Sequence, residues 1–222
     1  MNRWLKCITM FAGMGAMPAV AGFINFESGF VDQQRIYAVD TGDNTVDFSV
    51  WTSADTPAHD YAYVARAGGR ETAYAPGDRI PLGHDGGRFF ATDEYDGPRR
   101  AFNYRFDFAN GIRSFGLDLY DYRADGGARI GDSVTLYLYD SSSLVVGSQT
   151  HTIIQGLPDA NLFSFDIDLG ELVAMSAYLD FSRPDVGTGI DNLRFASVPE
   201  PGTYALFGLG LLGLAYARRH VR

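Results

Sequence analysis

Alternation of apolar and polar residues is the dominant pattern along this chain. Residues 102–108 carry an aromatic side chain at every second position, and residues 134–139 and 163–169 repeat the pattern with mixed apolar side chains. Such a period of two places all the apolar side chains on one face of an extended strand. Shorter segments of the same kind lie at 23–27, 46–51, 61–65, 88–91, 112–120, 144–146, 151–154, 173–181 and 190–195.

Turn residues separate these segments. Asn110-Gly111 lies between 102–108 and 112–120, and this dipeptide predicts a β-hairpin that joins the two segments. Residues 171–178 follow Gly170 and keep no clear 3.6-residue period, so we expect a strand there rather than a helix. Residues 67–100 are rich in Gly, Asp, Arg and Pro, and they predict long loops around one or two short strands.

Roughly ten short strands without an amphipathic helix are typical of an all-β fold, and we predict an antiparallel β-sandwich of the jelly-roll type. The composition agrees, because the chain has 22 Asp against 5 Glu, 17 Arg against a single Lys, and 26 Gly in 222 residues. Asp and Gly favour turns, whereas the scarce Glu and Lys are strong helix formers. Cys7 is the only cysteine, which excludes an internal disulfide.

The first 21 residues have the organisation of an export signal. Arg3 and Lys6 precede an apolar run, and Ala19 and Ala21 stand at positions −3 and −1 of an expected cleavage site after Ala21. We therefore predict a signal peptide at 1–21. A buried N-terminal helix is the alternative.

The last 25 residues, 198–222, have three parts in order. Pro199-Glu200-Pro201 comes first, an uncharged Gly-rich run follows at 203–217, and a basic end contains Arg218, Arg219 and Arg222. A helix over 203–217 is about 22 Å long, which is short for a ~30 Å hydrocarbon core. We expect a single transmembrane helix with the basic end in the cytoplasm, which leaves the preceding domain outside.

These residues resemble the PEP-CTERM sorting tail of exopolysaccharide-producing Gram-negative bacteria, which is recognised by the membrane enzyme exosortase. The resemblance implies cleavage near Pro199-Glu200-Pro201 after an intermediate anchored in the inner membrane, and delivery to the cell surface or extracellular matrix. An ordinary tail anchor that is never cut is the alternative. Both prolines keep this strip extended and unable to pair in a sheet, which suits a protease-like recognition site.

The domain between the two ends, 22–197, carries a second resemblance at its edges. Residues 25–29, Asn-Phe-Glu-Ser-Gly, and residues 189–195, Gly-Ile-Asp-Asn-Leu-Arg-Phe, look like the first and last strands of galactose-binding-like jelly rolls. That resemblance implies a structural calcium held by Glu27 and Asp191, with backbone carbonyls completing the shell. The alternative is that both are edge residues satisfied by backbone N–H groups and Arg.

Candidate chemistry in the domain favours binding over catalysis. His59, His84 and His151 show no metal-binding spacing. Sugar rings pack on flat aromatic side chains, and the tyrosines that this mode of binding would use are Tyr61, Tyr63, Tyr74, Tyr95, Tyr137 and Tyr139. These tyrosines also fit ordinary sheet surface.

The net charge of −9 argues against nucleic acid as a partner. Each end of the chain carries a net charge of +2, so the domain between them is strongly acidic, at −13. A polyanion would therefore need a local Arg patch. We expect a non-catalytic module that binds carbohydrate, such as exopolysaccharide, or serves structurally. A secreted polysaccharide-active hydrolase is the alternative.

Overall fold

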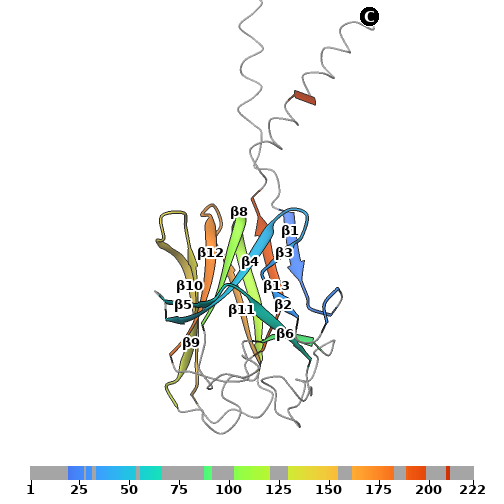
Figure 1. The fold of residues 1–222 in the computed structure, drawn as a ribbon. Coiled ribbons are helices and arrows are strands. Elements are labelled where there is room, and N and C mark those ends of the chain that lie inside the picture. The colour runs from blue at the N-terminus through green and yellow to red at the C-terminus, as the bar shows by residue number, and fades with distance from the viewer. Residues whose placement is uncertain are drawn as a thin grey trace, which may run out of the picture.

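The computed structural model describes residues 20–27, 29–31, 34–53, 56–66, 88–91, 103–120, 130–154, 162–182, 189–198 and 209–210. The predicted all-β fold is confirmed, and each strand pairing in the described ranges is antiparallel (Figure 1). The strands are β1 (Val20–Ile24), β2 (Arg35–Ile36), β3 (Ala38–Asp40), β4 (Thr45–Ser53), β5 (Thr56–His59), β6 (Ala62–Arg66), β7 (Arg88–Ala91), β8 (Asn103–Tyr120), β9 (Ser133–Tyr139), β10 (Val145–Thr152), β11 (Leu162–Asp168), β12 (Ala174–Phe181) and β13 (Gly189–Ser197).

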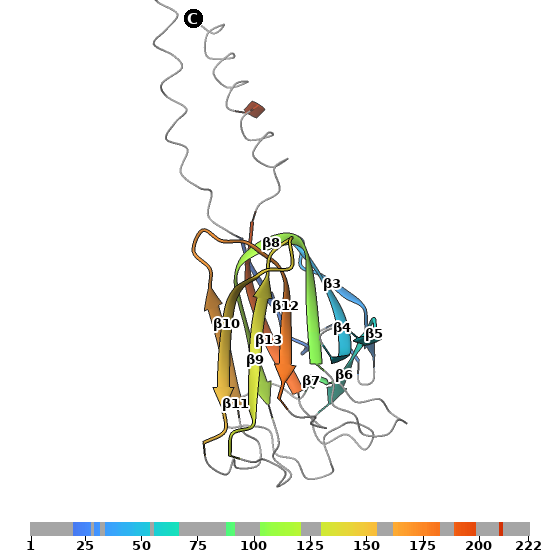
Figure 2. The same cartoon turned by 90° about the vertical axis from the view of Figure 1, so that its left-hand side faces the viewer.

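The 18-residue strand β8 joins the two layers of the sandwich. Residues 103–108 pair with β4 on one edge and β12 on the other, while residues 112–120 pair mainly with β11 and β13. Both edges of each half are thus occupied by other strands. The chain does change direction between the two halves of β8. Figure 2 shows, however, that β8 forms an arch over one end of the sandwich, so its two halves run down different sides of the molecule. The predicted hairpin is therefore wrong, because the two halves of β8 pair with other strands and not with each other.

Each half of β8 belongs to a different group of hydrogen-bonded strands. The first half of β8 belongs to the order β10-β9-β12-β8-β4, to which β3 and β5 add at β4. The second half lies between β11 and β13. The edge of β13 that faces away from β8 pairs with β1 along one part and with β7 along another. The order then continues through β6 to β2. First and last strands meet, since Val20 pairs with Ser197.

The core confirms the period of two. Val134, Leu136 and Leu138 are fully buried, while the intervening residues of β9 are partly exposed. Phe106 and Phe108, from the first half of β8, contact Phe115 of the second half with ring centroids 5.5 and 5.4 Å apart. Strands of both layers, in which apolar and polar side chains alternate, therefore bury their apolar faces against one another. This burial is the main source of stability in a sandwich.

Several predictions about the chain ends fall on residues outside those described. These are residues 1–19, with Arg3, Lys6 and Ala19, the motif Pro199-Glu200-Pro201 and the basic residues Arg218, Arg219 and Arg222; of the predicted helix 203–217, only 209–210 are described, and they are helical. Within the described ranges, no helix is long and apolar enough to cross a membrane. Ala21 lies in β1, where it pairs with Ala196 and its side chain is exposed.

Candidate functional site

Aromatic and polar side chains gather on the solvent-facing side of the β10-β9-β12-β8-β4 group. Residues that alternate with the buried ones project there, because successive side chains of a strand point to opposite faces. The pairing registers put Tyr178 between Tyr137 on β9 and Arg105 on β8. We call this surface the aromatic face, and its residues are Trp51, Asn103, Arg105, Asp107, Tyr137, Tyr139, Tyr178 and Asp180.

The rings of the aromatic face hold fixed relative orientations. Trp51 and Tyr178 meet edge to face, with centroids 6.4 Å apart, and Tyr137 and Tyr139 lie 6.2 Å apart. The guanidinium of Arg105 stands 5.3 Å from the centre of the Trp51 ring. Trp51, Tyr137 and Tyr139 are partly exposed, whereas Tyr178 is buried between its neighbours. Three rings therefore remain available to a flat ligand.

Asn103 organises the polar groups beside these rings. Its Nδ2 donates to the Tyr178 hydroxyl at 2.7 Å and to Asp180 Oδ1 at 3.1 Å, and its Oδ1 accepts from the Phe181 amide at 3.0 Å. Burial raises the pKa of Asp180, and the hydrogen bond from Asn103 opposes that change. The buried Asn103 amide thus fixes both the tyrosine and the carboxylate.

Arg105 is the cation of the aromatic face, and it is already paired. Its Nε and Nη2 donate to the Asp107 carboxylate at 2.8–3.0 Å, a bidentate arrangement. Hydrogen bonding to Asp107 raises the pKa of Arg105, although its partial burial opposes this. Since Asp180 adds a second carboxylate, the aromatic face has no surplus positive charge.

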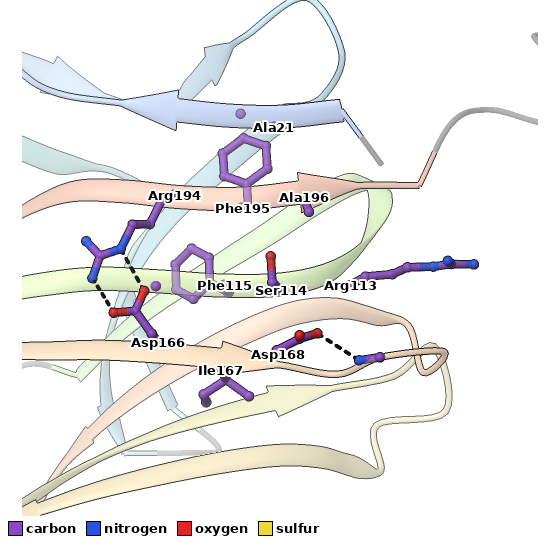
Figure 3. A pocket seen from close by; sticks show the side chains of 13 residues that line it. Ala21, Arg113, Ser114, Phe115, Asp166, Ile167, Asp168, Arg194, Phe195 and Ala196 are labelled. Atoms are coloured by element: carbon purple, nitrogen blue, oxygen red, sulfur yellow. Dashed lines mark hydrogen bonds and ion pairs between the residues drawn. The ribbon is translucent and has the colours of Figure 1, made fainter. Parts of the chain in front are cut away.

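The opposite group of strands carries a groove of about 600 Å³, lined by parts of β1, β8, β11 and β13 (Figure 3). Gly116 is one of the residues that line it. A Cβ on Gly116 would lie 2.3 Å from Asp166 Oδ1 and 2.6 Å from the Phe165 carbonyl oxygen, so only glycine fits there. The side chains of Asp166 and Arg194 meet in this groove, as Figure 3 shows.

All the hydrogen-bond donors of Arg194 bind acceptors within the protein. Nε and Nη2 donate to the two oxygens of Asp166 at 2.7 and 2.9 Å, and Nη2 also donates to the Phe165 carbonyl at 3.1 Å. Nη1 donates to Asp118 at 3.1 Å and to the Asn192 carbonyl at 3.0 Å. A guanidinium has five N–H groups, so none remains for a ligand. Arg194 therefore acts as a clamp between β11, β8 and β13.

Glu27 and Asp191, the predicted calcium ligands, are brought near each other where the chain leaves β1 and enters β13. Asp191 is 1% exposed and accepts from the backbone amides of Asn192 and Phe26. Burial raises the pKa of Asp191 to about 7, with further increases from the charges of Glu27 and Asp118. Asp118 itself is bound by Arg194 and Asn192.

Two neighbouring carboxylates suit calcium, since a cation would relieve their repulsion. Among the described residues, however, no group of three or more His, Cys, Asp or Glu side chains is arranged to hold a metal ion. A calcium ion on Glu27 and Asp191 would therefore take most of its ligands from backbone carbonyls.

The predicted sugar-binding tyrosines divide into three sets. Tyr137 and Tyr139 lie on the aromatic face, Tyr61 and Tyr63 lie together beside β2, and Tyr74 and Tyr95 are outside the described residues. Trp51, Asn103 and Arg105 were not predicted to belong to a site. All three alternate with buried apolar residues of their strands, so the period of two could have indicated which face they share but not their neighbours.

A protein-family model described as the PEP-CTERM protein-sorting motif matches residues 197–219. The predicted sorting tail is thus confirmed, and the motif implies exosortase processing and export through the cell envelope to the surface. No curated protein sequence matches the chain.

Several solved structures show a low similarity to this chain. They include the K2 cleaved adhesin domain of Lys-gingipain, with TM-score 0.46, 13% identity, and coverage of 80% of this chain and 99% of that one. A DUF4465 family protein from Bacteroides caccae has TM-score 0.43, 12% identity, and coverage of 84% and 96%. A family 29 carbohydrate binding module has TM-score 0.34, 12% identity, and coverage of 80% and 89%.

Proposed function

We propose that this chain is an exported, non-catalytic protein of the cell surface or extracellular matrix whose sandwich domain, 22–197, binds a neutral glycan such as exopolysaccharide. In this proposal the signal peptide 1–21 directs export, and the helix 203–217 holds an intermediate in the inner membrane. Exosortase then cuts near Pro199-Glu200-Pro201. The observation that supports the binding role is the aromatic face, where three partly exposed rings lie beside fixed hydrogen-bonding groups.

The chemistry of the aromatic face suits a sugar chain. The apolar side of a pyranose packs on flat rings, and the hydroxyls exchange hydrogen bonds with amides, carboxylates and guanidinium groups. Asp107 already neutralises Arg105, and Asp180 adds another acidic group. A neutral glycan meets no repulsion there, whereas an acidic glycan does.

Replacing Trp51 with alanine is expected to weaken glycan binding at least ~10-fold, because buried aromatic anchors carry most of the energy of such contacts. The full chain, in a detergent without a sugar headgroup, would be screened on an array of oligosaccharides. Binding of the strongest neutral one would then be measured by calorimetry. Trp51→Phe should keep most of the affinity, and Phe23→Ala, which removes an exposed ring from β1, should leave it unchanged.

Other outcomes would change the assignment. If no oligosaccharide and no envelope polysaccharide binds, or if Trp51→Ala binds like the wild type, the glycan-binding proposal fails and a structural role remains. Release of shorter products from the polysaccharide would instead indicate a hydrolase.

We also propose that Glu27 and Asp191 hold a structural calcium ion. Calcium at 100 times its dissociation constant would stabilise the folded chain by about 2.7 kcal/mol. The melting midpoint in calcium should therefore exceed that in chelator by several degrees. Glu27→Gln should remove the difference, while Glu171→Gln, at a 92% exposed side chain, should not. An equal midpoint with and without chelator contradicts the proposal.

A further inference from the structure

Three tyrosines and one arginine form a cluster at the open edge of the sheet, where β2 is the last strand. Arg35 on β2 pairs with Tyr63 on β6, and the guanidinium lies 4.6 Å from the Tyr61 ring centre and 5.7 Å from that of Tyr63. Tyr61 meets Tyr37 and Tyr63 edge to face at 5.6 and 5.4 Å. We call these four residues the edge cluster.

The edge cluster is open to solvent. Tyr37 is 53% exposed, Arg35 is exposed, and Tyr61 and Tyr63 are partly exposed. Their neighbours on the same strands, Ile36 and Ala62, point into the core. The rings therefore add nothing to the main core, and this surface presents flat aromatic groups to the outside.

Arg35 differs from the other arginines whose side chains the structure describes. Arg105 pairs with Asp107, Arg113 lies 3.9 Å from Glu171, and Arg194 is held by Asp166 and Asp118. No carboxylate within the described ranges pairs with Arg35, whose Nε donates to the Tyr63 hydroxyl at 3.1 Å. A guanidinium has five N–H donors in a planar fork, and tyrosine hydroxyls use only part of them.

We propose that the edge cluster is a second sugar-binding site, selective for a residue that carries a carboxylate, such as a uronic acid. The pyranose ring would pack on the exposed tyrosine rings, and Arg35 would hold the carboxylate with two parallel N–H···O bonds. An acidic sugar needs a local cation on a domain of this acidity, and Arg35 is a cation with no carboxylate partner among the described residues.

The aromatic face and the edge cluster then differ in charge preference. The first has an arginine neutralised by Asp107, and the second has an arginine with no acidic partner among the described residues. A chain with both sites would suit a polysaccharide that contains both neutral and acidic sugars. This second site rests on observations independent of Trp51, so either proposal stands without the other.

The test compares acidic oligosaccharides with their own methyl esters, which keep the sugar and remove the charge. The full chain would be titrated with hexamers of galacturonate, glucuronate and mannuronate and with each ester. At least one acid should bind ~10-fold more tightly than its ester, and this preference should shrink as salt is raised. Arg35→Gln should abolish the preference, whereas Arg113→Gln, at an arginine outside the cluster, should retain it.

Two further variants separate stacking from charge. Tyr61→Ala should weaken both the acid and its ester, and Trp51→Ala should leave the acid preference intact. If none of the three acids exceeds its ester, or if Arg35→Gln keeps the preference, the proposal is overturned. Equal binding of polyglutamate would also overturn it, since the edge cluster would then recognise acidic peptides.

Discussion

Replacement of Pro199, Glu200 and Pro201 with alanine is expected to leave nearly all of the protein at full length in the inner membrane. The motif lies inside the 197–219 match to the sorting-motif family. Proline restricts the backbone and lacks the N–H group that a sheet partner would need, and both properties are lost with alanine. Intact mass measurement on membrane and released fractions, in a host with an exosortase, would report the change.

The fold adds a spatial reason for this expectation. Strand β13 ends at Ser197, which is 1% exposed and whose hydroxyl accepts from Asn44 Nδ2 at 3.1 Å. The amide of Val198 still donates to the Gly111 carbonyl at 2.7 Å. The chain is thus held to the sandwich up to the residue before Pro199. An enzyme that cuts near Pro199-Glu200-Pro201, as proposed, would therefore act close to the arch of β8.

A matched control replaces Ser141 and Ser142, in the exposed turn after β9, with alanine. The alanine variants keep the hydrogen bond from the amide of residue 142 to Asp140 Oδ1, so folding and processing should both be normal. Normal shortening of the triple-alanine variant would show that exosortase does not read Pro199-Glu200-Pro201. Loss of shortening in the serine variant would show that the assay follows folding instead.

Strand positions were predictable because the period of two is local. Each of the segments 102–108, 134–139 and 163–169 shows its buried face without reference to any other part of the chain. The hairpin prediction failed because Asn110-Gly111 specifies a reversal and not the partners of the strands that it joins. Those partners, β4, β11, β12 and β13, come from segments far away in sequence, and their pairing turns the reversal into an arch.

The aromatic face was only partly predictable for the same reason. Tyr137 and Tyr139 alternate with buried residues along one strand, so their partial exposure could be predicted from the sequence. Trp51, Asn103, Arg105 and Tyr178 become their neighbours through the registers of β4, β8 and β12, which no local pattern encodes. The lack of an acidic partner for Arg35 among the described residues is likewise a property of three-dimensional contacts.

The wild-type chain is expected to lose stability between pH 5 and pH 8, in chelator, through Asp191. Burial and the charges of Glu27 and Asp118 raise the pKa of Asp191 to about 7, against 3.8 for the ordinary group. Between these values the folded state binds a proton that the unfolded state has released, so the free energy of unfolding falls as pH rises. The loss amounts to at most ~2.5 kcal/mol over this interval.

Asp191→Asn should remove this slope, because an amide keeps an acceptor oxygen for the Asn192 and Phe26 amides and cannot ionise. Urea unfolding at pH 5, 6, 7 and 8 would measure it, with the exposed Asp60→Asn as the control that retains the wild-type slope. A wild type whose stability is flat over this range, or a variant that keeps the slope, would contradict the assignment. Calcium should flatten the wild-type slope as well, since a cation on Glu27 and Asp191 favours the ionised carboxylates.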